Sequence, residues 1–117
     1  MIDILNRCII KNGQTVKFSK IILIDGFYFR IEDDVIGEVR FNADIFFVAI
    51  NNDMSIPLRI KFFDVSSLKL NFESRHILGF DILDMKEHGW SNDCRYHFMD
   101  YEDGVMDFYC SKLYLVE

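Results

Sequence analysis

The stretch "DCRYHFMDYEDGVMDFYC", Asp93 to Cys110, decides the fold expected of this chain. Two runs of alternating apolar residues flank an acidic connection that contains a glycine, which is the pattern of a β-hairpin. The apolar sets are Cys94, Tyr96 and Phe98 before the turn and Met106, Phe108 and Cys110 after it. Both sets face one core only if Phe98 lies opposite Phe108, which predicts a loop of Glu102-Asp103-Gly104 with the glycine in the left-handed conformation.

The same register predicts the composition of the opposite face of the hairpin. Asp93, Arg95, His97 and Met99 alternate with the apolar set, so they point away from the core. His97 is expected opposite Tyr109, and Met99 opposite Asp107. We therefore expect the charged residues of this stretch to form one lateral surface.

The rest of the chain also reads as strands. "RCIIK-NG-QTVKF" and "IILI-DG-FYFRIE" place Asn12-Gly13 and Asp25-Gly26 between β-rich flanks, which predicts two hairpins. Short apolar or alternating runs continue to the carboxy terminus at the spacing of a sandwich or barrel. The sequence predicts one all-β domain over residues 1–117, mainly antiparallel, a sandwich or partly open barrel built of hairpins. At most one short helix is expected, over 2–8 or 42–50.

Composition restricts the class of protein. The chain of 117 residues is half apolar, with 27% charged residues and a single proline, which is enough apolar content for one folded core. No apolar run reaches the roughly 20 residues of a membrane helix, and the first residues lack the features of a secretory signal. Three cysteines in no C-x-x-C spacing are expected to be reduced thiols. We expect a soluble cytoplasmic protein without membrane contact.

The net charge of −6 is confined to the last third of the sequence. Residues 1–75 hold ten acidic and ten basic residues, whereas residues 76–117 hold nine acidic and three basic ones. An acidic surface repels nucleic acid and attracts a basic partner, although acidic charge also serves solubility alone. Nucleic-acid binding is therefore not expected.

Catalytic and metal chemistry find little support in the motifs. The chain has no nucleophile elbow, no glycine-rich phosphate loop and no zinc or EF-hand spacing, so we expect no enzyme activity, no cofactor and no metal site. Asp93, Arg95 and His97 alternate along one strand and leave an alternative open, a small enzyme or ligand-binding β-barrel that uses this face. A subunit that pairs through an exposed sheet edge is a further alternative.

Trp90, the single tryptophan, lies in the loop-like run "KEHGWSND". It either caps one end of the sheet as a core residue or anchors a partner from an exposed position. Both interpretations stay open.

The run from Trp90 to His97, a W-x-x-D-x-R-Y-H pattern followed by "DYEDG" and "FYC", resembles a group of all-β immunity proteins encoded beside bacterial polymorphic toxins. The likeness covers residues 58–117, including "LRIKFFDVSSLKL". It implies a non-enzymatic inhibitor that binds and neutralises one cognate toxin domain, for instance a basic nuclease. We expect the chain itself to be a monomer or weak dimer. The residues expected to contact that partner are Asp81, Asp84, Glu87, Trp90, Asp93, Arg95, His97, Asp100, Glu102, Asp103, Asp107 and Tyr109.

Overall fold

The computed structural model describes residues 1–33, 37, 39–71, 75–86, 94–100 and 106–117, and these form an all-β fold. The strands are β1 (Ile2–Asp3), β2 (Cys8–Lys11), β3 (Gln14–Lys17), β4 (Ile21–Asp33), β5 (Val39–Asn51), β6 (Met54–Phe63), β7 (Ser66–Leu70), β8 (Phe80–Asp84), β9 (Tyr96–Asp100), β10 (Met106–Cys110) and β11 (Lys112–Val116).

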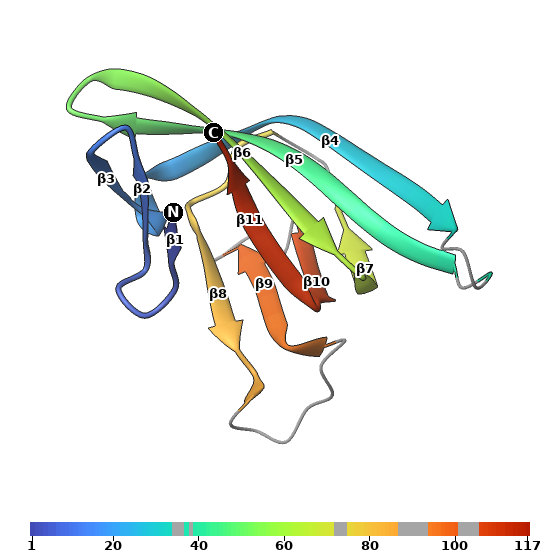
Figure 1. Cartoon of the computed structure of the whole chain (residues 1–117). Helices are drawn as coiled ribbons and strands as arrows, with labels where there is room; N and C mark the ends of the chain where they lie inside the picture. The colour runs from blue at the N-terminus through green and yellow to red at the C-terminus, as the bar shows by residue number, and fades with distance from the viewer. Residues whose placement is uncertain (34–36, 38, 72–74, 87–93, 101–105) are drawn as a thin grey trace.

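The strands form an antiparallel sandwich of two four-stranded sheets with a small third sheet beside them. The first large sheet has the order β11-β6-β5-β4 and the second β7-β10-β9-β8, while β1-β2-β3 form the third. Figure 1 shows the two large sheets layered on each other, with β1–β3 beside β8. At the opposite end, β4 and β5 project past β7 as a two-stranded ribbon. The all-β sandwich expected from the alternating apolar runs is confirmed.

Aromatic side chains from both large sheets meet in the core. Phe47 and Phe62 come from the first sheet, and Phe80, Phe98 and Phe108 come from the second; all five are at most 1% exposed. Phe98 lies at the centre of this group, with its ring centroid 4.9 Å from Phe80 and 4.9 Å from Phe108. Burial of such rings is the main stabilising contribution to a fold of this size.

Two register predictions are confirmed. β9 and β10 pair with Phe98 opposite Phe108 and His97 opposite Tyr109. The turn between β2 and β3 has Asn12 at φ 51° and Gly13 at φ 77°, the two positive values that a type I′ turn requires. The loop expected at Glu102-Asp103-Gly104 lies outside the described residues.

The hairpin expected at Asp25-Gly26 is wrong, because β4 runs through this dipeptide without turning. The register shifts between Ile24 and Gly26, so the dipeptide marks a β-bulge in the long ladder with β5. A Cβ at Gly26 would lie 3.2 Å from the Tyr28 ring and 3.3 Å from the Phe46 ring. Glycine is therefore required for the close approach of Phe46 and not for a turn.

The short helical segment also differs from expectation. Within the described residues it is one 3-10 turn, Phe18–Lys20, whereas β5 occupies all of 42–50, and a strand and a turn occupy 2–8. Phe18 is buried against Phe80, with ring centroids 4.8 Å apart, so this turn carries a core residue between two strands. None of the described segments forms a helix with the length and apolar character needed to cross a membrane.

Candidate functional site

The outward side chains of β9 and β10 form a cluster around His97. His97 Nε2 lies 2.8 Å from Asp107 Oδ1, and the imidazole ring stacks on the ring of Tyr109 at 4.3 Å between centroids. The ring planes differ by 12°, so the contact is nearly parallel. Cross-strand pairing produces this arrangement, because Tyr109 is directly opposite His97 and Asp107 is its diagonal neighbour.

Arg95 lies on the other side of β9, toward β8. Its Nη2 is 3.6 Å from Asp84 Oδ2, and its guanidinium carbon is 4.9 Å from the centre of the Tyr96 ring. Asp84 Oδ1 also accepts the backbone N–H of Lys86 at 3.0 Å. Burial raises the pKa of the Tyr96 phenol, so this ring is neutral at physiological pH.

One nitrogen of Arg95 is poorly satisfied. Its Nε is buried and has no hydrogen-bond partner among the described residues. A buried donor without an acceptor costs about 1–3 kcal/mol, so the position of Arg95 is not optimal for stability. Residues that break a stability rule in this way are found preferentially at functional sites.

We call Asp84, Arg95, His97, Asp107 and Tyr109 the motif surface, which consists of two paired groups: Arg95 with Asp84 on the β8 side of β9, and His97 with Asp107 and Tyr109 on the β10 side. Its ionisable side chains are partly exposed, from 16% for His97 to 42% for Asp84. The salt bridges and the ring stack restrict the rotamers of these side chains before any partner arrives. A surface ordered in this way loses less conformational entropy on binding.

Asp81 and Asp100 do not belong to that surface, which corrects the expectation that the acidic residues form one exposed patch. Asp100 has the same alternation as Phe98, is 7% exposed and accepts the backbone N–H of Met106 at 3.1 Å. Asp81 is 9% exposed, accepts the N–H of Ile82 at 2.9 Å and lies 3.5 Å from Arg7. Both carboxylates are therefore engaged within the fold.

The other residues expected at the site lie outside the described part of the chain. They are Glu87, Trp90, Asp93, Glu102 and Asp103. The alternative trio of Asp93, Arg95 and His97 is thus described only at its last two members. Arg95 contacts Asp84 on β8 and His97 contacts Asp107 on β10, so these two side chains point to opposite neighbours of β9 and do not converge.

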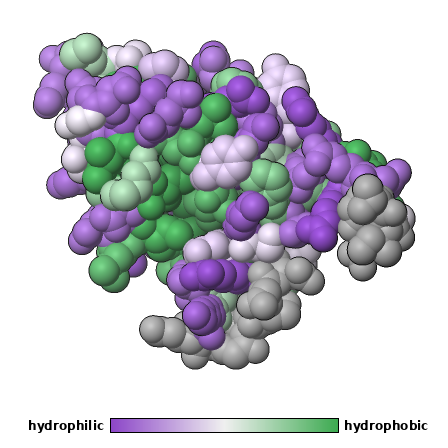
Figure 2. Space-filling view, in the orientation of Figure 1, coloured by the Kyte–Doolittle hydropathy of each residue, from purple (hydrophilic) through white to green (hydrophobic). Residues whose placement is uncertain are grey.

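An apolar groove borders the motif surface. It has a volume of about 420 Å³ and runs between the segment before β2 and strand β8, lined by Ile4, Leu5, Arg7, Ile82, Leu83, Asp84 and Lys86. Leu5 is 90% exposed and Leu83 39%. Figure 2 shows apolar surface gathered over β1, β2 and β8. An apolar hollow beside charged side chains is the setting in which interfaces receive an anchor residue.

The β11-β6-β5-β4 sheet carries a cationic face that was not predicted from the sequence. Arg30, Arg59, Lys61 and Lys112 alternate outward on β4, β6 and β11, and cross-strand pairing brings them together. The neutral total of residues 1–75 concealed this face, although the alternation of Arg59 and Lys61 with buried residues signals it.

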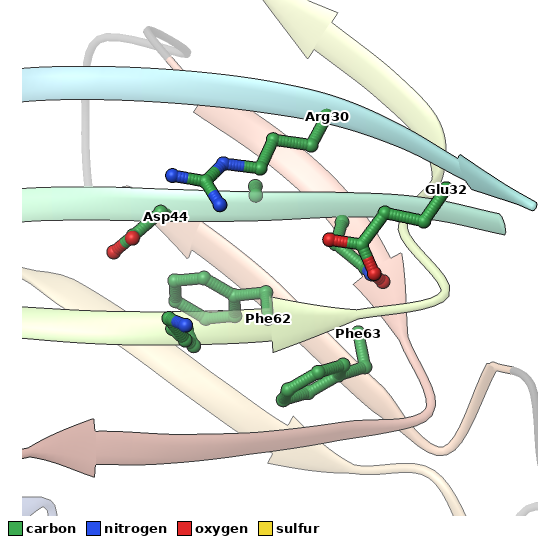
Figure 3. A pocket seen from close by; sticks show the side chains of 8 residues that line it. Arg30, Glu32, Asp44, Phe62 and Phe63 are labelled. Atoms are coloured by element: carbon green, nitrogen blue, oxygen red, sulfur yellow. The ribbon is translucent and has the colours of Figure 1, made fainter.

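Asp44 is the buried anion beneath this cationic face. Arg59 Nε donates to Asp44 Oδ1 at 2.9 Å, and this hydrogen bonding lowers the pKa of the Asp44 carboxyl. Beside the pair is a hollow of about 30 Å³, over which Arg30 and Glu32 reach from β4 (Figure 3). Space of this size holds about one water molecule, so the hollow is too small for an organic ligand.

The three thiols are free. Cys110 is fully buried, and burial raises the pKa of its thiol to about 12. Cys94, which was expected in the core, is half-buried, with its sulfur 3.7 Å from Ser66 Oγ. In the described residues, no group of three or more His, Cys, Asp and Glu side chains is placed to hold a metal ion.

Comparison with protein-family models, with curated proteins and with solved structures finds no match to this chain.

Proposed function

We propose that this protein is an immunity protein that binds a cognate toxin domain in the bacterial cytoplasm and blocks it through the motif surface. The observation that carries the proposal is the pairing of the motif residues Arg95 and His97 with Asp84 and Asp107 on the two neighbouring strands. The two pairs lie on either side of β9, are partly exposed, and are held by contacts within the chain before a partner binds. Arginine and tyrosine are enriched at protein interfaces, and Arg95 and Tyr109 supply both here.

The acidic last third of the sequence indicates the charge of the partner. The nine acidic residues against three basic ones in 76–117 favour a basic toxin surface, because complementary charge accelerates association. Many toxin domains are nucleases, and a nuclease needs a basic cleft for its phosphate substrate. The groove beside Asp84 would accept an apolar side chain of the same partner.

Growth rescue tests the proposal directly. The carboxy-terminal domain of the large protein encoded immediately upstream is induced in bacteria, with and without this chain. We expect toxicity alone, growth when both are present, and a complex that survives copurification. Toxicity without rescue would contradict the immunity function.

A matched pair of charge reversals locates the surface. Asp107→Lys should raise the dissociation constant of the complex at least about tenfold, because it places a cation against a basic partner. Glu117→Lys makes the same change of charge at an exposed residue of the carboxy terminus and should leave binding unchanged. Circular dichroism checks that both variants fold. Equal binding by the two variants would remove the motif surface from the mechanism.

A further inference from the structure

Among the described residues, the outer edge of β4 is covered at one end only. Leu23 bridges His76, and the N–H of Ile24 donates to the carbonyl of Arg75 at 2.8 Å. From Tyr28 to Asp33, no described strand pairs with this edge. The two register shifts of β4 lie before Phe27, so the uncovered part is a regular strand.

Three charged residues, Arg30, Glu32 and Asp33, lie on this edge, but the other devices that prevent edge pairing are absent from its described part. No proline, lysine or bulge occurs from Tyr28 to Asp33. Phe29 is 42% exposed and Ile31 67%, on the same face of the ribbon as Phe41. Phe29 stacks on Phe41 with ring centroids 5.7 Å apart. A regular edge with exposed apolar side chains is a template for another strand, and its charged residues favour a register that sets opposite charges against each other.

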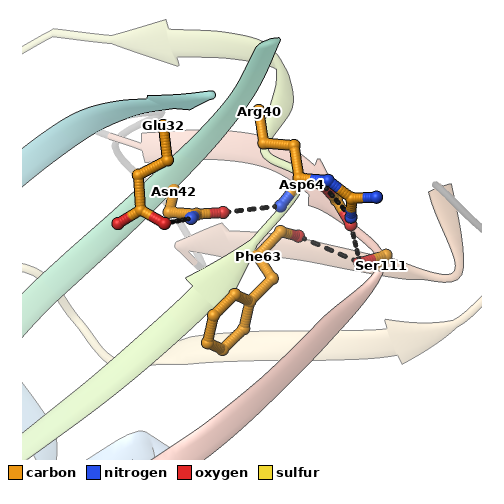
Figure 4. Close-up of polar contacts among 6 residues, drawn as sticks. All are labelled: Glu32, Arg40, Asn42, Phe63, Asp64 and Ser111. Atoms are coloured by element: carbon orange, nitrogen blue, oxygen red, sulfur yellow. Dashed lines mark hydrogen bonds and ion pairs between the residues drawn. The ribbon is translucent and has the colours of Figure 1, made fainter. Parts of the chain in front are cut away.

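The ribbon is held in place by a chain of hydrogen bonds at its base (Figure 4). The side-chain amide of Asn42 makes both bonds: its Nδ2 donates to Glu32 Oε2 at 2.9 Å, and its Oδ1 accepts the backbone N–H of Asp64 at 3.1 Å. Asp64 Oδ2 accepts the hydroxyl of Ser111 at 2.5 Å. These contacts link β4 and β5 to the segments around Asp64 and Ser111, so the edge is presented in one orientation.

We propose that the β4 edge binds a second copy of this chain, with the two β4 strands antiparallel about a two-fold axis at Ile31. In this register Ile31 faces its own copy, and Arg30 lies opposite Glu32 of the second copy at two symmetric contacts. Opposite charges at directly facing positions stabilise a strand pair. The dimer joins the β11-β6-β5-β4 sheet of one copy to the same sheet of the second copy, so that the two form one continuous sheet.

The neighbouring registers that keep side chains on matching faces are less favourable. An axis at Arg30 would place the two Arg30 guanidinium groups opposite each other. An axis at Phe29 would place Asp25 opposite Asp33 of the second copy. Like charges at facing positions destabilise a strand pair, so the charge pattern of the edge selects the axis at Ile31.

Sedimentation of the full chain over a concentration series tests the proposal without any toxin, so its outcome is independent of the proposed function. We expect the mass to rise from 13.9 kDa toward twice that value. Arg30→Glu and Glu32→Arg should each raise the dimer dissociation constant at least about tenfold, because two contacts become repulsive. The double variant restores opposite charges and should restore the dimer.

Two further variants separate edge pairing from other contacts. Ile31→Lys places two ammonium groups at the axis and should give a monomer; Ile31 is exposed, so the fold tolerates the change. Val39→Lys removes apolar surface from the same face of the ribbon but lies on β5, away from the axis, and should leave the dimer intact. A wild-type chain that stays monomeric, or a double variant that fails to recover, would overturn the proposal.

Discussion

Replacing Phe98 by alanine tests the central role assigned to this ring. Phe98 is fully buried, and its ring centroid lies within 6.0 Å of those of Phe47, Phe62, Phe80 and Phe108. Phenylalanine to alanine in a core costs about 3–5 kcal/mol, and each aromatic pair adds about 0.5–1.5 kcal/mol beyond buried area. Because four pairs are lost at once, we expect a loss near the upper end, about 5 kcal/mol.

Such a loss is a large part of the total, since a domain of this size has an unfolding free energy of about 5–15 kcal/mol. We expect the midpoint of thermal unfolding to fall by roughly 15–20 °C, and urea unfolding to give the loss in free energy directly. Phe29→Ala is the control, because Phe29 is 42% exposed and makes one stacked pair; its cost should be about 1 kcal/mol or less. A Phe98→Ala variant that loses less than about 2 kcal/mol would refute the assignment of Phe98 as the centre of the core.

Three further outcomes follow from the packing and the electrostatics. The hydrogen bonds from Arg59 lower the pKa of Asp44 below its ordinary value, so the unfolded chain binds more protons at acid pH than the folded chain. The stabilisation that Asp44 contributes is therefore present above about pH 4 and is lost as pH falls through the lowered pKa. Asp44→Asn should flatten that part of a series of urea midpoints measured against pH. Cys110, with its pKa raised to about 12, should react with iodoacetamide at pH 8 only after denaturation, as peptide mass spectrometry can establish; labelling of the native chain at this residue would contradict its burial. Gly26→Val should lower the unfolding free energy by at least about 1 kcal/mol in urea titration, because the new side chain meets Phe46, whereas an unchanged midpoint would show that the ring moves aside.

The register of β9 and β10 was predictable because both strands carry strict alternation around one connection. The same alternation includes Asp100, which shares the parity of Phe98, yet its carboxylate charge led us to expect an exposed residue. The structure buries it because the N–H of Met106 provides a donor. Charge alone is thus a poorer guide to exposure than position in the strand.

The Asp25-Gly26 dipeptide shows why other parts of the fold could not be predicted from the sequence. Locally it has the composition of a tight turn, but the ladder with β5 continues through it and Phe46 occupies the space beside Gly26. Pairing between strands distant in sequence decided the outcome, and a local pattern does not contain that information. The cationic face escaped prediction for the same reason, since Arg30, Lys61 and Lys112 share a face only when the four strands β4, β5, β6 and β11 align.

Strands β9 and β10 carry buried core rings and the outward residues His97, Asp107 and Tyr109 at alternating positions. Substitution at His97, Asp107 or Tyr109 therefore changes the outward side chains while the neighbouring buried rings stay in place. An insertion of one residue within β9 has the opposite effect, because it exchanges the inward and outward sets together. Under the proposed function, recognition on this hairpin can diverge over evolutionary time by replacement of side chains, whereas a change in strand length disturbs the core and the outward face in one step.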